Sequence, residues 1–287
     1  MNFLVFQSIN ALAFGSLLFM IASGFSLIFG LMDIVNLTHA IFYMMGSYIG
    51  YTVFVHTGSF FLAIITAGVI VSLIGGMKYR FFLQGLHGQS LRQVLLCLGF
   101  LFVFDDLLLI IFGGNPFIIN TPSKLRGATV IGGVFFSNYR LFLIIAGIVL
   151  VIIMYLLIEK TKIGSLIRAG VDDEEMVRAM GIDINKIFLF VYMMGVFFAA
   201  IGGVFGGVIL GMEPRMAFSI LPLALVVVII GGKGNIMGAY FGSIVVAFID
   251  NFGRALLPEF SYFTLFLPMV LILTFKPEGL FGRSKKN

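Results

Sequence analysis

The chain has 287 residues, of which 60% are hydrophobic and only 11% charged, and its mean hydropathy is +1.13. Soluble domains carry about 25% charged residues, so the composition excludes a soluble enzyme or binding module. The net charge of +5 does not indicate a nucleic-acid partner, because the basic residues flank apolar runs and there orient membrane spans. The sequence therefore predicts an all-α, polytopic membrane protein in contact with the lipid bilayer, with one transmembrane domain over residues 1–287.

The apolar runs predict about eight or nine transmembrane helices, because a helix needs about 20 apolar residues to cross a bilayer. The runs cover residues 8–32, 39–56, 60–77, 93–112, 138–158, 187–211, 217–230, 238–252 and 260–275. The pair 217–230 and 238–252 is short, so it predicts either two tilted spans or one broken or re-entrant element. The first residues, MNFLVFQSINALAFG, lack the basic and small-residue pattern of a signal peptide, and we expect none to be cleaved.

A polar segment follows the first run, with Asp33, Asn36, Thr38 and His39 among apolar neighbours. A charged residue at mid-bilayer costs roughly 2.5–3.5 kcal/mol, and non-helical backbone at that depth is tolerated only inside protein or along a water-filled cavity. We favour the interpretation that these residues fix a break between two helices. The alternative is that they line the translocation path. A proton relay through Asp33 and His39 would suit a secondary transporter.

Basic residues gather in the segments 78–92, 159–186 and 276–287, which predicts that these three lie in the cytoplasm. The intervening segment 113–137, rich in Asn, Pro, Thr and Gly, is then external. No Lys or Arg precedes Lys78, so charge leaves the side of the N-terminus open.

The segment 159–186 contains RAGVDDEEMVRAMGIDINK. Asp172 and Glu175 have the spacing of a capping box, and Gly181 can take the left-handed position after a helix end. These features predict a short helix over about 173–180. Its apolar side could rest on lipid headgroups or dock a cytoplasmic partner, and the residues alone favour neither. That side consists of Met176, Val177, Ala179 and Met180.

Glycines cluster late in the chain, in GGKGNIMGAYFG. The four-residue spacing from Gly234 predicts a helix face that lets another backbone approach closely. The spacing is not that of a Walker A loop and no Ser or Thr follows Lys233, so we expect no nucleotide site. The predicted helix-packing residues are Gly231, Gly232, Gly234, Gly238 and Gly242.

The remaining candidates for chemistry are few. Cys97 is the only cysteine, and the three histidines lie in separate segments. We therefore expect no catalytic residues, no metal site and no cofactor. The pair Asp105–Asp106 lies inside an apolar run and has no explanation from the sequence.

Four motifs in the same order resemble the branched-chain amino-acid permease family, the membrane subunits of bacterial ABC importers. They are GLMDIVNLTHAIFYMMGSY, RAGVDDEEMVRAMGID, GGKGNIMGAYFG and KPEGLFG. The residue after His39 is usually glycine in this family and is Ala40 here, which weakens any inference about the substrate.

The resemblance implies a subunit of the cell inner membrane that forms the translocation path for branched-chain or related hydrophobic amino acids. Its implied partners are separate ABC ATPase subunits, a second homologous permease and an extracytoplasmic substrate-binding protein. The segment 159–186 is implied to be the loop that couples to the ATPase. The implied coupling residues are Arg168, Asp172, Asp173, Glu174, Glu175, Met176, Arg178, Ala179, Met180 and Gly181.

Two alternatives stay open. The same family includes permeases for urea and short-chain amides. A self-contained secondary transporter or channel is less favoured, because membrane-embedded acidic residues are scarce.

Overall fold

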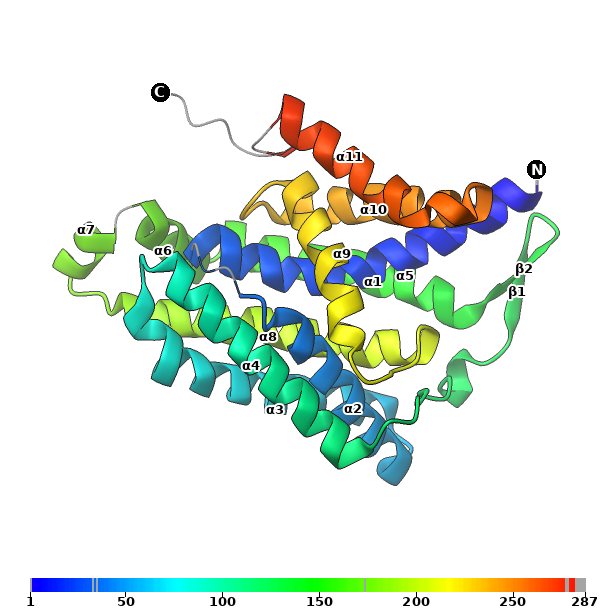
Figure 1. Ribbon diagram of the computed structural model, residues 1–287, viewed down its shortest axis with the longest axis horizontal. Coiled ribbons are helices and arrows are strands. Elements are labelled where there is room, and N and C mark those ends of the chain that lie inside the picture. Colours follow the sequence, from blue (N-terminus) through cyan, green and yellow to red (C-terminus); the bar gives the residue numbers. More distant parts are fainter. Residues whose placement is uncertain (1, 33, 35, 173, 277–278, 282–287) are drawn as a thin grey trace.

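The computed structural model describes residues 2–32, 34, 36–172, 174–276 and 279–281 (Figure 1). Nearly all of these residues are helical. The helices are α1 (Asn2–Met32), α2 (His39–Thr57), α3 (Phe60–Lys78), α4 (Ser90–Phe112), α5 (Asn138–Lys160), α6 (Lys162–Asp172), α7 (Glu174–Ala179), α8 (Ile184–Ile209), α9 (Met216–Gly231), α10 (Ile236–Leu256) and α11 (Ser261–Phe275).

These helices confirm the predicted fold class of a polytopic helical membrane protein. Each of the nine apolar runs corresponds to one helix. Among the described residues, six helical segments are long and apolar enough to cross a membrane, and α9 and α11 are shorter apolar helices. The pair divided by GGKGN forms two helices, α9 and α10, joined by a tight turn. In Figure 1, α9 runs across the direction of its neighbours.

A short hairpin that the sequence did not predict lies in the segment 113–137. Strands β1 (Ala128–Ile131) and β2 (Val134–Ser137) pair antiparallel, and the two glycines between them have φ of +60° and +80°. Such a turn needs left-handed backbone at both positions, which glycine adopts without strain. Nearby, Phe117 and Met212 exchange two backbone hydrogen bonds of 2.8 Å, so this segment is fastened to the end of α8.

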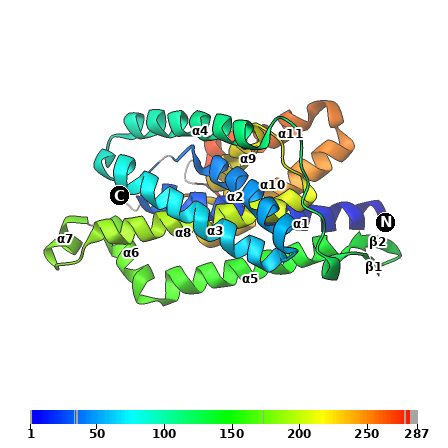
Figure 2. The same cartoon turned by 90° about the horizontal axis from the view of Figure 1, so that it is seen from below.

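Helices α1 and α8 form the centre of the bundle. Helix α1 packs against α8, α10, α5 and α9, and α8 also packs against α2 and α3. Helix α4 lies at one edge (Figure 2). The outer faces of α3, α4 and α5 expose large apolar side chains such as Phe61, Ile110 and Ile145, as expected where a helix faces lipid.

The central helices touch through backbone. A Cβ atom placed on Gly24 of α1 would lie 2.8 Å from the carbonyl carbon of Gly195 in α8, and closer still to its oxygen. Between α2 and α8, Ser47 Oγ donates a hydrogen bond of 2.7 Å to the Gly203 carbonyl. Small residues allow this approach, which supplies packing where lipid gives no hydrophobic driving force between helices.

The described residues between α1 and α2, Ile34 and 36–38, are not helical. Helix α1 ends at Met32, yet His39 at the start of α2 lies beside Ile21, which is 11 residues back along α1 and so about 16 Å from its end. Residues 36–38 therefore lie back inside the bundle before α2 begins.

The segment 78–92 differs from the prediction of a basic loop. Lys78 is the last residue of α3 and is only 3% exposed, and helical turns continue from Tyr79 to Leu86. The turn itself is confined to residues 87–89. Lys78 therefore belongs to the interior of the bundle and says nothing about sidedness.

Gly24→Ala is expected to destabilise the protein by about 1–3 kcal/mol, because the added methyl group must push α1 and α8 apart. Gly99→Ala is the matched control: Gly99 is also inside a helix, α4, but its Cβ would meet open space, and alanine is the better helix former. Thermal unfolding in detergent checks both. Equal melting temperatures for the two variants would contradict the backbone contact.

Candidate functional site

The segment of residues 162–183, called here the α6–α7 segment, stands at one end of the bundle, opposite the β hairpin (Figure 1). Gly181 has φ of +81°. Its N–H donates to the Arg178 carbonyl at 2.9 Å, and the Ile182 N–H donates to the Val177 carbonyl at 3.3 Å. This pair of bonds is a Schellman motif, so Gly181 ends α7 at the position where the sequence places the end of a helix.

The short helix α7 presents two methionines to its surroundings. Met176 and Met180 are 62% and 68% exposed, whereas Val177 turns inward and is buried. Ala179 and Arg178 are also exposed. Exposed methionines are flexible and polarisable and adapt to many partner surfaces. The apolar side predicted for this helix is therefore divided between an outer surface and the bundle.

Arg168 joins α6 to the end of α5. Its guanidinium lies 3.3 Å from Glu159 and also donates to the Ile158 carbonyl. On the other flank, Asp183 accepts a hydrogen bond from the Asn185 N–H and caps α8, and the contact with Lys186 lowers the pKa of its carboxyl. Both ends of the α6–α7 segment are therefore tied to long helices.

Several predicted residues lie outside what the structure describes. Asp33 and Asp173 are among the residues it leaves out, and for Asp172 and Glu174 only the backbone is described. The capping box of Asp172 and Glu175 therefore stays a prediction.

Asn36 and Thr38 meet Lys78 in a completely buried polar cluster. The Lys78 ammonium donates to Thr38 Oγ1 at 2.5 Å, to Asn36 Oδ1 at 3.1 Å and to Tyr192 OH at 3.3 Å. It also lies 3.4 Å from Cys97 Sγ. The cluster joins the non-helical connection between α1 and α2 to α3, α4 and α8.

His39 is held separately, within hydrogen-bonding distance of helix α1. Its Nε2 lies 3.0 Å from the Ile21 carbonyl oxygen, and the side chain is fully buried against the Phe25 ring. Thr38 Oγ1 in turn donates to the Cys97 carbonyl at 3.0 Å. All three described polar residues of this segment thus contact neighbouring elements of the bundle.

The late glycines lie at two close contacts. Gly231 of α9 meets Gly238 of α10 backbone to backbone, and Gly242 contacts the same turn of α9. Gly234 precedes α10, with φ of +71°, and packs against Gly30 of α1. The predicted single helix face is therefore wrong for Gly234. Gly232, with φ of +90°, begins the turn between the two helices.

Asp105 and Asp106 have different environments. Asp105 is 4% exposed and lies close to Arg215, whose φ of +67° makes it the one non-glycine residue in the left-handed region among those described. Asp106 is exposed on α4. The inward carboxylate thus has a charged neighbour, which sequence reasoning could not supply because Arg215 is far along the chain.

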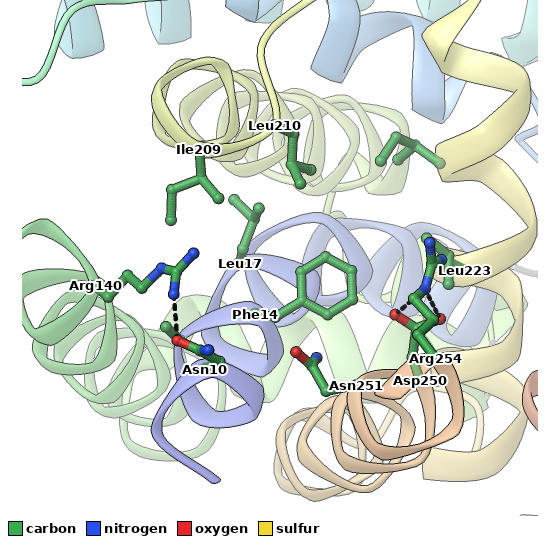
Figure 3. Close-up of a pocket in the computed structure, with 12 residues that line it drawn as sticks. Asn10, Phe14, Leu17, Arg140, Ile209, Leu210, Leu223, Asp250, Asn251 and Arg254 are labelled. Atoms are coloured by element: carbon green, nitrogen blue, oxygen red, sulfur yellow. Dashed lines mark hydrogen bonds and ion pairs between the residues drawn. The ribbon is translucent and has the colours of Figure 1, made fainter. Parts of the chain in front are cut away.

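A cavity of about 310 Å³ opens toward the hairpin end of the bundle, between α1, α5, α8, α9 and α10 (Figure 3). We call it the α1–α10 cavity. Its lining residues are Asn10, Ala13, Phe14, Leu17, Arg140, Ile209, Leu210, Ile220, Leu223, Asp250, Asn251 and Arg254. The sequence marked only Asp250 among them, as one of the few acidic residues inside an apolar run.

Two polar contacts border this cavity. Arg140 donates to Asn10 Oδ1, and Arg254 Nε lies 2.9 Å from both oxygens of Asp250. Apart from Asn251, the rest of the wall is apolar. Elsewhere in the described part of the chain, no three His, Cys, Asp or Glu side chains gather as metal ligands would.

Comparison with known proteins matches most of the chain to one protein family. The sequence profile described as "Branched-chain amino acid transport system / permease component" matches residues 8–274. The chain is 26% identical to the high-affinity branched-chain amino acid transport system permease protein BraD of Pseudomonas aeruginosa, over 96% of this chain and 95% of that protein.

Two further relatives differ in coverage. The corresponding permease protein LivH of Escherichia coli is 22% identical over 96% of this chain and 95% of its own length. The ribose import permease protein RbsC of Escherichia coli is 32% identical, but over 45% of this chain and 42% of its own. No solved structure matches.

Lys78→Met is expected to destabilise the protein by about 1–3 kcal/mol, because it leaves the buried Asn36 Oδ1 with only the weak Cys97 thiol as a donor. Lys160→Met, at the exposed end of α5, is the control and is expected to change little. Thermal unfolding in detergent measures both. If Lys78→Met were more stable than the wild type, burying the ammonium would cost more free energy of desolvation than its hydrogen bonds recover.

Proposed function

We propose that this chain, which belongs to the branched-chain amino acid transport permease family, is the membrane-spanning subunit of an ATP-driven importer of branched-chain or related hydrophobic amino acids. ATP hydrolysis takes place on separate ATPase subunits. A second homologous permease completes the path, and an extracytoplasmic binding protein delivers the substrate. The relatives BraD and LivH, named as branched-chain amino acid permeases, support this substrate class; permeation of urea or short amides is the alternative within the family.

The α6–α7 segment is the observation that carries this proposal. It places a short helix and two exposed methionines at one end of the bundle; Arg168 ties the preceding helix α6 to α5, and Asp183, shortly after α7, caps α8. A force on α7 would therefore be transmitted to two long helices. We infer that α7 docks into the ATPase, and that closure of the ATPase on ATP moves α5 and α8 and switches the path between outward- and inward-facing states.

The same geometry supports an orientation. If the α6–α7 end is cytoplasmic, as its basic residues indicate, then the hairpin end is extracytoplasmic. Phe6 of α1 stacks on Phe136 of β2, with ring centroids 6.0 Å apart. We infer that the chain starts on the extracytoplasmic side. The nine-span alternative then places the basic tail 276–287 in the cytoplasm, in agreement with its charge.

The cluster around Lys78 supports the helix-break interpretation of Asn36, Thr38 and His39. Their contacts are with the backbone of α1 and α4 and with Lys78. We infer that they hold the connection between α1 and α2 in place, and that substrate does not touch them.

Gly181→Asp is expected to abolish ATP-dependent uptake of radiolabelled leucine, isoleucine or valine into proteoliposomes that hold this chain with its partner subunits. The substitution strains the left-handed end of α7 and adds a charge at the proposed docking surface. Gly133→Asp is the matched control, since Gly133 has nearly the same φ, +80°, and also faces open space, but lies in the hairpin at the other end.

Three outcomes are distinguishable. Uptake that needs ATP and binding protein and is lost in Gly181→Asp alone supports the proposal. Uptake by the wild-type chain alone, without ATP, would contradict it. Uptake of urea or short amides in place of the amino acids would show that the proposed substrate class is wrong and that the chain belongs to an amide importer.

A further inference from the structure

The α1–α10 cavity combines charges of both signs with an apolar wall. Asp250, on α10, is 4% exposed and Arg254 holds both of its carboxylate oxygens at 2.9 Å. Arg140 borders the cavity from α5, and Phe14 and Leu17 of α1 lie between the two sides (Figure 3). Its volume of about 310 Å³ is at the lower end of the range of about 300–1,000 Å³ for small-molecule sites, so it suits a small ligand.

Arg140 has more N–H donors than its contact with Asn10 uses. A guanidinium carries five N–H donors, and Arg140 donates to the neutral Asn10 side chain. Among the described residues, no carboxylate forms an ion pair with Arg140. A planar guanidinium can bind a carboxylate through two parallel hydrogen bonds, so a ligand carboxylate would complete its contacts.

The opposite side of the cavity holds an ion pair. Arg254 Nε lies 2.9 Å from both oxygens of Asp250, and the Asn251 amide nitrogen donates to the Ala247 carbonyl at 2.9 Å. Arg254 itself is 61% exposed on its side chain, so it orients Asp250 from the rim without filling the cavity.

We propose that the α1–α10 cavity is a transit site that holds the free amino acid, with its carboxylate on Arg140 and its aliphatic side chain on Phe14 and Leu17. This inference rests on the proposed function. The cavity lies at the end of the bundle where that function places the binding protein. A transit site must bind weakly enough to release its ligand, and a small, open cavity without a lid meets this requirement.

Protection of an introduced cysteine tests the site directly. Cys97 is the chain's only cysteine and is buried, so a hydrophilic maleimide reacts with Leu210→Cys on the cavity wall, where the residue is 48% exposed. L-leucine at millimolar concentration is expected to slow this labelling severalfold in nanodiscs of phosphatidylcholine. Leu257→Cys, 52% exposed and outside the cavity, is the control and should be labelled at the same rate with and without leucine.

The charges are tested in the same assay. Isoamylamine, which lacks the carboxylate, should not protect Leu210→Cys, and Arg140→Gln should abolish protection by leucine. In the assembled transporter, Arg140→Gln should lower the maximal rate of leucine uptake at least about tenfold, while Arg140→Lys retains part of it. Arg126→Gln, in the exposed segment before the hairpin, should transport as the wild type does.

The outcomes separate the two proposals. Suppose that the wild type takes up leucine, but leucine does not protect Leu210→Cys or Arg140→Gln transports at the full rate. Either result would overturn the transit site and leave the importer proposal intact. Arg140 would then be assigned to contacts with water or lipid headgroups. No amino-acid uptake by the wild type, with protection by urea or acetamide, would overturn the amino acid as substrate. If Arg140→Gln unfolds, the isoamylamine comparison on the wild-type background decides alone.

Discussion

The contact between α1 and α8 at Gly24 and Gly195 is the constraint on which the bundle depends. Helices gain little from burying apolar side chains against one another in lipid, since the lipid is equally apolar, so close packing has to hold them together. These two glycines allow α1 and α8 to touch backbone to backbone. Five other helices pack around this pair: α5, α9 and α10 on the side of α1, and α2 and α3 on the side of α8. A motion of α8 would therefore be felt first by α1, α2 and α3.

Polar contacts add specificity to this packing. The described residues between α1 and α2 lie inside the bundle and outside any helix, so their polar groups need partners there. From the end of α3, Lys78 donates hydrogen bonds to Asn36 and Thr38, and it also contacts Tyr192 of α8 and Cys97 of α4. A charged donor makes stronger hydrogen bonds than a neutral one. The ammonium that the sequence assigns to a basic loop thus contacts this segment in the interior of the protein.

The sequence predicted what depends on local pattern. Nine apolar runs gave nine helices, and Gly181 was placed correctly because a helix end with left-handed backbone is a local property. The polar residues Asn36, Thr38 and His39 were predicted to lie at a helix break, but Lys78, which contacts Asn36 and Thr38, is about 40 residues further along the chain and was assigned to a loop. The α1–α10 cavity was missed for the same reason: Asn10, Arg140 and Asp250 come together only through tertiary packing. The hairpin was missed because its strands are four residues long.

The central claim is that α7 docks into a separate ATPase on the cytoplasmic side. Cross-linking in the assembled transporter tests it most directly. Met180→Cys, carrying a photoreactive thiol label, should cross-link to the ATPase subunit, with a yield that changes when ATP is added. A cross-link to the extracytoplasmic binding protein, or labelling of this cysteine by a membrane-impermeant reagent from outside intact cells, would contradict the account.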